Sequence, residues 1–115
     1  MIVGARRDPE WGPVLLLGLG GVWTEALGDI RLASPALDAA AIADELDRLK
    51  GAALLRGMRG APAIDKHAVA TVAATLAGLM RAEPALLDIE INPLMAYAEG
   101  ALALDALMIM DEGKC

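Results

Sequence analysis

The sequence predicts an α+β domain in which a mostly antiparallel sheet of about four to six strands packs against two main helices. Three observations support this fold class. Short apolar runs of strand length lie near both ends of the chain, the middle carries apolar residues at helical spacing, and 115 residues suffice for one core. Strands on either side of a block of helices indicate segregated elements rather than alternating βαβ units. We therefore expect residues 1–115 to form a single domain.

The first third of the chain is predicted to form strands. Ile2–Ala5 is a short apolar run, and residues 6–13 contain two prolines and a glycine, which favour a loop. Val14–Leu19 is almost entirely apolar, as in a strand that is covered on both faces. We interpret Val22–Leu27 as a further strand, with a turn at Gly28 before the sheet continues.

The middle of the chain changes to a helical period. Ile42, Leu46 and Leu49 lie four and three residues apart, so they share one face of a helix. Asp38 is a suitable N-cap for this helix, and Gly51 follows its end. A short helical turn is expected directly after Gly51.

A second helix is predicted after Asp65, which can cap its start, and before Pro84, which ends it. Its apolar residues again recur at helical spacing, namely Val69, Val72, Leu76 and Leu79.

Residues Leu86–Met110 are predicted to form two antiparallel strands that are joined near Glu99 and Gly100. Polar side chains recur at every second position of the first strand, so they share one face with two apolar residues: Asp88, Glu90, Asn92, Leu94 and Ala96. The opposite face is expected to be the core face, with Ile89, Ile91, Pro93, Met95 and Tyr97. Pro93 lacks an N–H group, which predicts an edge strand or a local break there.

The length of the connecting loop decides which residue lies opposite Asn92. A two-residue loop would place Asp105 opposite Leu94, and a four-residue loop from Tyr97 to Gly100 would place Asp105 directly opposite Asn92. Both put Asp105 on the polar face, whereas a three-residue loop would turn it into the core. An even-length loop is favoured because Leu102, Leu104 and Met108 are expected in the core.

Carboxylates on one strand face repel one another. Neighbours on a face lie about 6.6 Å apart, where two charges repel by roughly 2.5 kcal/mol at an effective dielectric constant of ~20 and by less than about 1 kcal/mol in water. Such a cluster needs solvent, protonation or a cation. A solvent-facing polar surface and a cation site both fit the pattern, and Asn92 favours the cation because its amide oxygen adds a hard ligand without charge.

Composition limits the classes of partner. The chain is 57% hydrophobic and 23% charged, as expected for an ordered globular domain, and its net charge is −6. Without a basic run, neither nucleic acid nor a membrane is an expected partner. The only cysteine is Cys115, which excludes an internal disulfide and favours a cytoplasmic protein.

Four spaced blocks identify a family resemblance. They are IVGARRDPEWGP, LLLGLGGVWTEALGD, LLRGMRG upstream of Asp65, and EINPLMAYAEGALALDA. In this order they resemble the ATP-grasp domain of the ADP-forming acyl-CoA synthetases, which are related to the succinyl-CoA synthetase β subunit. The resemblance extends from about Ile2 to Met108 and implies one lobe of an ATP-grasp fold, the C-terminal one.

The resemblance implies a magnesium site and a nucleotide. In that family the asparagine of the EINPL motif and the aspartate of the return strand hold Mg²⁺ at the nucleotide phosphates, and these positions are Asn92 and Asp105 here. Glu90 matches the glutamate of the motif, which is a third metal ligand in many ATP-grasp proteins. The cofactors implied are therefore Mg²⁺ and ATP or ADP, with CoA bound elsewhere in the full protein. Members of the family make or use acyl-CoA through an acyl phosphate and a phosphohistidine.

Two further residues are candidate nucleotide contacts. Glu25 would face the nucleotide if its strand alternates, and Arg59 stands between glycines in a loop from which it could reach a phosphate; a solvated side chain is the alternative for both. No catalytic residue is expected in this chain, since its only histidine, His67, lies outside the motifs that carry the phosphohistidine.

The resemblance covers only the later of two lobes. We expect the chain to be part of a longer synthetase or a subunit that needs a partner, to which the other ATP-grasp lobe and the CoA-binding domain belong, and to be inactive alone. A regulatory or assembly module without catalysis, or the ATP-grasp-like part of a protein acetyltransferase, is the alternative.

Overall fold

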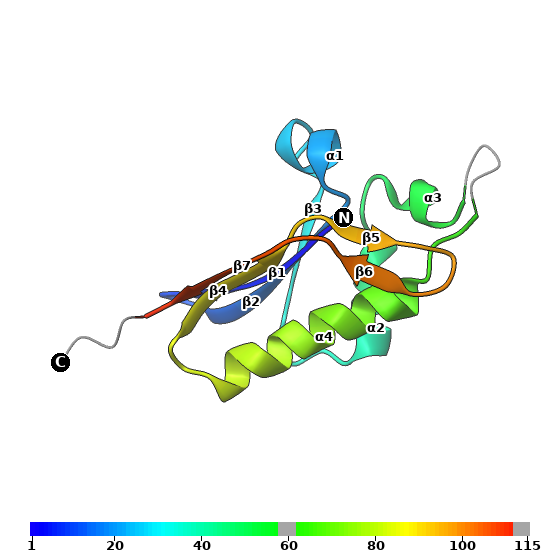
Figure 1. The fold of residues 1–115 in the computed structure, drawn as a ribbon. Coiled ribbons are helices and arrows are strands. Elements are labelled where there is room, and N and C mark those ends of the chain that lie inside the picture. The colour runs from blue at the N-terminus through cyan, green and yellow to red at the C-terminus, as the bar shows by residue number, and fades with distance from the viewer. Residues whose placement is uncertain (58–61, 112–115) are drawn as a thin grey trace.

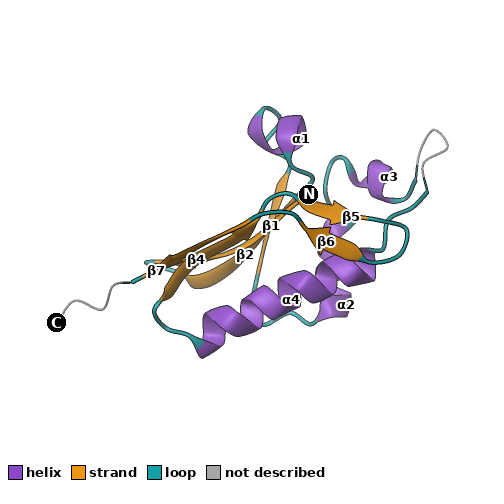
Figure 2. Ribbon diagram, viewed as in Figure 1, coloured by secondary structure: helices purple, strands orange, loops and turns teal. Residues whose placement is uncertain are grey.

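The computed structural model describes residues 1–57 and 62–111, without the side chains of Val22 and Trp23. Its main layer is an antiparallel sheet of five strands in the order β3-β2-β1-β4-β7, and helices α2 and α4 cover one face of it (Figure 1). Colouring by secondary structure separates this sheet from a short ribbon, β5–β6, which lies beside α4 (Figure 2). The predicted α+β class is confirmed.

The elements follow one another in a simple order along the chain. They are β1 Ile2–Asp8, β2 Gly12–Gly18, α1 Gly21–Glu25, β3 Ile30–Ala33, α2 Ala39–Leu46, α3 Ala52–Leu55, α4 Lys66–Ala82, β4 Leu86–Ile91, β5 Leu94–Ala96, β6 Ala101–Ala103 and β7 Ala106–Met110.

Strands β1 and β2 form a tighter hairpin than the sequence predicts. The expected loop over residues 6–13 is reduced to its centre, because β1 runs on to Asp8 and β2 begins at Gly12. The Asp8 carboxylate accepts hydrogen bonds from the backbone N–H groups of Glu10 and Trp11, at 2.8 and 2.9 Å. These bonds close the turn locally, and the positive φ of Gly12 (74°) lets β2 start at once.

The predicted strand at Val22–Leu27 is wrong, because the chain forms the short helix α1 there. Gly20 and Gly21 both have positive φ angles, 86° and 54°, which turn the chain directly after β2. The Thr24 hydroxyl then accepts a hydrogen bond from the Gly20 N–H group at 3.0 Å and stabilises the turn.

The two main helices form with the predicted caps. The Asp38 carboxylate accepts from Ala41 N at 2.8 Å, and the Asp65 carboxylate accepts from Ala68 N at 3.0 Å. The buried stripe of α4 differs from the predicted one, since Leu79 is exposed and four alanine and methionine positions replace it. The stripe consists of Val69, Ala70, Ala73, Leu76, Ala77 and Met80. Its small residues allow the helix to approach the sheet closely.

Arg7 ties β1 to the C-terminal end of α4. Its guanidinium donates to the carbonyl oxygens of Met80 (2.7 Å), Glu83 (3.2 Å) and Leu86 (3.1 Å). The carbonyl groups of Met80 and Glu83 are among those that the end of a helix leaves without an internal partner, and Leu86 is the first residue of β4. Arg7 is thus a structural residue, and its neighbour Arg6 points to the other face of the sheet.

The C-terminal hairpin has the four-residue loop that places Asp105 opposite Asn92. Ala96 pairs with Ala101, and Tyr97 N donates to Gly100 O at 3.0 Å. As predicted from Pro93, the hairpin breaks after β4, and the ribbon β5–β6 forms a sheet of its own.

Beyond this break the predicted faces are wrong. Leu94 is buried in the core, whereas Met95 and Tyr97 are exposed. The side of the ribbon that carries Leu94 faces α4. The alternation of buried and exposed side chains along β4 therefore does not continue through Pro93.

The expected burial of Leu102, Leu104 and Met108 is also wrong, since all three are exposed. Strand β7 is an edge strand of the sheet, and β6 belongs to a ribbon of only two strands. Neither is covered by the helices, which lie over β1 and β2. Within the described ranges, no helix is both long and apolar enough to cross a membrane.

We predict that Leu17→Ala lowers the free energy of unfolding by about 2–5 kcal/mol, because Leu17 is fully buried (0% exposed) and its loss leaves a cavity. Leu32→Ala is the matched control on the neighbouring strand, where the side chain is 65% exposed, and it should change stability by less than about 0.5 kcal/mol. Urea denaturation of both variants measures the difference. Equal losses would contradict the placement of the core between the sheet and the helices.

Candidate functional site

The predicted metal ligands line one pocket at the end of β4. Glu90 lies on β4, Asn92 follows this strand, and Asp105 immediately precedes β7. With Ala106 and Leu107 they surround a hollow of about 200 Å³. The backbone places Asn92 opposite Asp105, because Asn92 N donates to Asp105 O at 3.0 Å and Ile91 pairs with Ala106.

The three side chains that could donate oxygen ligands differ in their hydrogen bonds. One carboxylate oxygen of Asp105 accepts from Ala106 N at 2.9 Å, which orients the side chain and leaves the second oxygen available. The side chains of Glu90 and Asn92 form no hydrogen bond with the described residues. The residues that line the pocket thus include two carboxylates and one amide, whose oxygens are hard donors.

These donors do not form a complete cage. In the described part of the chain, no three histidine, cysteine, aspartate or glutamate side chains are close enough to hold a metal ion. A cation at Glu90, Asn92 and Asp105 would therefore need further oxygen ligands. Magnesium sites of this type take them from water and from substrate phosphates.

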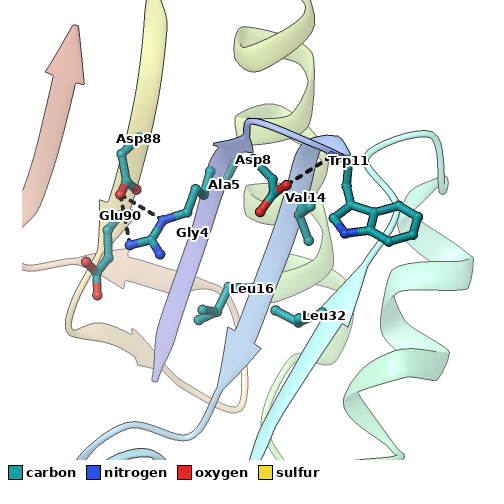
Figure 3. Close-up of a pocket in the computed structure, with 10 residues that line it drawn as sticks. Gly4, Ala5, Asp8, Trp11, Val14, Leu16, Leu32, Asp88 and Glu90 are labelled. Carbon is teal, nitrogen blue, oxygen red and sulfur yellow. Dashed lines mark hydrogen bonds and ion pairs between the residues drawn. The ribbon is translucent and has the colours of Figure 1, made fainter.

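A second and larger pocket, of about 310 Å³, lies on the same face of the sheet (Figure 3). Leu16 and Leu32 form part of its apolar floor, and Asp88 and Glu90 project from β4 on one side. Glu90 lines both pockets, so the two hollows adjoin. The helices cover the opposite face of the sheet, which leaves this face open.

Gly4 lies at the centre of the open face, where it pairs with Glu90 across β1 and β4. A Cβ atom at this position would stand 3.2 Å from Ile89 O and 3.7 Å from Glu90 Cα. Because Gly4 has no side chain, the backbone of β1 can lie close to Glu90, and no side chain of Gly4 fills the space over the open face.

Among the described residues that line either pocket, Arg6 supplies the only cationic side chain. Its Nε and Nη2 atoms lie 3.3 and 3.4 Å from the same oxygen of Asp88, and the Arg6 side chain is 76% exposed. A long, exposed contact of this kind contributes little to stability. Arg6 can consequently exchange its partner for an anionic ligand.

Asp8 fixes the rim of the larger pocket. The hydrogen bonds from the N–H groups of Trp11 and Glu10 lower the pKa of the Asp8 carboxyl below its usual value, because they stabilise the charged form. The turn holds Trp11 at the edge of the pocket, where this side chain is 81% exposed.

The two predicted nucleotide contacts, Arg59 and Glu25, have different outcomes. Arg59 lies outside the described residues. Glu25 is exposed on helix α1 and lines neither pocket, so the argument from an alternating strand is wrong for it.

The sequence analysis did not propose Arg6, Gly4 or Asp8 as site residues. Their alternation along β1 matches that of Asp88 and Glu90 along β4, and this signal was hidden because the strand was expected to end at Ala5.

Comparisons with known proteins agree with the fold. A family model described as an ATP-grasp domain matches residues 1–110, which confirms the family resemblance. Trans-feruloyl-CoA synthase FCS1 from an unknown prokaryotic organism is 46% identical over 113 residues, which are 96% of this chain and 16% of that protein. The β subunit of ADP-forming acetate–CoA ligase I from Pyrococcus furiosus is 33% identical over 110 residues, 96% of this chain and 47% of the subunit.

Solved structures give the same result. The dinucleotide-forming acetyl-coenzyme A synthetase 1 of Ca. Korarchaeum cryptofilum, in complex with coenzyme A and Mg-AMPPCP, matches with a TM-score of 0.87 and 29% identity. The match covers 95% of this chain and 51% of that one. Its complex with coenzyme A, Ca-AMPCP and HgCl⁺ gives a TM-score of 0.90 at 28% identity, over 95% and 48% of the two chains. This chain thus spans about half of the matched subunits and 16% of the longer synthase.

We predict that Asp8→Asn reduces the loss of stability in acid. A lowered carboxyl pKa stabilises the native state fully above the unfolded value near 3.8, and this contribution disappears as the pH falls through the native pKa. Between about pH 5 and pH 2, the urea midpoint of the wild-type protein should therefore fall more steeply than that of the variant.

Glu10→Gln is the control, because it removes a charge from the same turn but its carboxylate accepts neither of the two hydrogen bonds. Parallel pH profiles for the wild-type protein and Asp8→Asn would show that the Asp8 carboxylate does not stabilise the turn by its charge.

Proposed function

Because this chain belongs to the ATP-grasp domain family, we propose that it is the Mg²⁺- and nucleotide-binding lobe of an ADP-forming acyl-CoA synthetase. The observation that carries the proposal is the convergence of Glu90, Asn92 and Asp105 on one pocket of the open sheet face. Relatives over nearly the whole chain are CoA ligases and synthetases, which supports the reaction class.

Asn92 and Asp105 would hold the metal, with Glu90 as the third ligand. Their donors are hard oxygens, and Glu90 and Asn92 have no competing hydrogen bond with the described residues, so the set suits Mg²⁺. Bound Mg²⁺ would neutralise charge on the phosphates of ATP or ADP during phosphoryl transfer. The protein's own contribution is to position the ligands, since the β4–β7 register fixes the two strands that carry them.

The nucleotide would lie along the open face. Arg6 stands beside the metal pocket and can pair with a phosphate in place of Asp88. The apolar floor with Leu16 and Leu32 offers space for the nucleoside. Contacts from Arg59 and Glu25 stay predictions.

The full protein would convert an acid, CoA and ATP into acyl-CoA, ADP and phosphate through an acyl phosphate and a phosphohistidine. This chain would supply the metal site, and the rest of the synthetase would supply the other ATP-grasp lobe, the CoA site and the histidine. The isolated chain is therefore not expected to turn over. The match to only part of each relative supports this division.

A second candidate function is assembly without catalysis. Exposed apolar side chains on β6, on β7 and between them favour it, since such side chains are typical of a surface that another protein covers: Leu102, Leu104, Leu107 and Ile109. The same surface would face another domain of a synthetase, and assembly alone gives no reason for the oxygen donors to converge. A role within a protein acetyltransferase would account for both the exposed apolar side chains and the oxygen donors.

We predict that Asp105→Asn weakens Mg²⁺-ADP binding by about tenfold or more, equivalent to about 1.4 kcal/mol, because it removes one ligand charge. Without metal, the variant should melt at the same temperature as the wild-type protein or higher, since repulsion from Glu90 is relieved while the Ala106 hydrogen bond can be kept. Calorimetric titration and thermal melting measure the two effects.

Asp44→Asn is the matched control, because it removes the same charge from an exposed position on α2, away from the open face. Equal responses of the two variants to Mg²⁺-ADP would remove the metal assignment. In the complete synthetase, Asp105→Asn should abolish ATP-dependent thioester formation, and retained activity would speak for the assembly function instead.

A further inference from the structure

Asp65 joins helix α4 to the tip of the β5–β6 ribbon. One carboxylate oxygen accepts from Ala68 N at 3.0 Å and caps the helix. The other oxygen accepts from Gly100 N at 2.9 Å, and Asp65 N donates to Tyr97 O at 2.7 Å. A single residue therefore holds both ends of the loop that turns the ribbon.

The carboxylate of Asp65 is suited to this contact. Hydrogen bonds from the backbone N–H groups of Gly100 and Ala68 lower its pKa, and the nearby His67 adds a smaller effect in the same direction. The carboxylate thus stays charged at neutral pH, where hydrogen bonds to a charged acceptor are stronger than neutral ones.

The ribbon needs such a contact because two short strands are marginally stable alone. At its base it is held by the mutual backbone hydrogen bonds of Met1 and Leu94, at 2.7 and 2.8 Å. Its buried side packs on α4 through Leu94. Among the described residues, Asp65 makes the side-chain contact to its tip.

The β5–β6 ribbon is directly connected to the two strand ends that line the metal pocket. Leu104 N donates to Pro93 O at 3.1 Å, and the next pair along the two chains is Asp105 and Asn92. The ribbon changes direction at this pair, between the main sheet and β5–β6 (Figure 1). The hydrogen bond between Leu104 and Pro93 thus connects the ribbon to the segment that carries Asp105.

We propose that Asp65 is a positioning residue for the metal pocket, which acts by fixing the tip of the β5–β6 ribbon to α4. The inference rests on the proposed function of Glu90, Asn92 and Asp105. Asp65 itself lines neither pocket and touches no metal ligand.

The test compares Asp65→Ser with Asp38→Ser in Mg²⁺ titrations of the intact chain in the presence of ADP. Serine retains a cap for α4 and for α2, respectively, so both variants should keep their helices. Only Asp65→Ser loses the hydrogen bond to Gly100, so it should bind Mg²⁺ about tenfold more weakly, in the range seen when residues that orient metal ligands are removed. Asp38→Ser should bind Mg²⁺ like the wild-type protein.

Asp65→Asn is the second variant, because its single carbonyl oxygen cannot replace both carboxylate oxygens at their two partners. It decides the question if the serine variant does not fold. Wild-type Mg²⁺ affinity in a folded Asp65 variant, while Asp105→Asn loses affinity in the same assay, would overturn the positioning role and leave the metal site intact. Failure of the wild-type chain to bind Mg²⁺ in the presence of ADP would overturn both.

Discussion

The antiparallel register between β4 and β7 is the constraint on which the proposed site depends. A four-residue loop sets this register at the far end of the hairpin, and the hydrogen bond from Asn92 N to Asp105 O maintains it at the pocket. Side chains alternate along a strand, so a shift by one residue would turn Asp105 to the other face. The position of the oxygen donors is thus a consequence of strand pairing, which the core beneath the sheet stabilises.

The two faces of the sheet have different roles, since one packs against the helices and the other carries the pockets. On the helix side, Val3 and Leu17 are buried, and Arg7 on the same side binds the end of α4. On the open side, Arg6 and Glu90 remain accessible. Because successive residues of β1 and β4 serve opposite faces, the same short strands stabilise the domain and present charged groups for a ligand. In the proposed site, a metal between acidic side chains and phosphates would reconcile the net charge of −6 with an anionic nucleotide.

Local signals in the sequence predicted the fold well, and they failed where tertiary contacts decide. Asp38 and Asp65 mark helix starts because a cap depends only on neighbouring residues. The helix after Gly21 was missed because its apolar residues resemble a strand, and the two positive φ angles that turn the chain are not visible in the pattern. The face reversal at Leu94 follows from packing against α4, which alternation alone does not contain. The four-residue loop and its register agree with one of the two even-length loops that the sequence allowed. The place of Arg6 beside Asp88 was not visible, because β1 was expected to end at Ala5.

The most direct test uses Asn92, which is the only asparagine in a chain without glutamine. The single side-chain NH₂ pair in the ¹⁵N-correlated NMR spectrum of the labelled protein therefore reports on the pocket. If Asn92 and Asp105 hold Mg²⁺ together, this pair should shift saturably as Mg²⁺ is added in the presence of ADP, and the shift should be lost in Asp105→Ala. An unmoved Asn92 pair, while backbone signals elsewhere respond to Mg²⁺-ADP, would contradict the account.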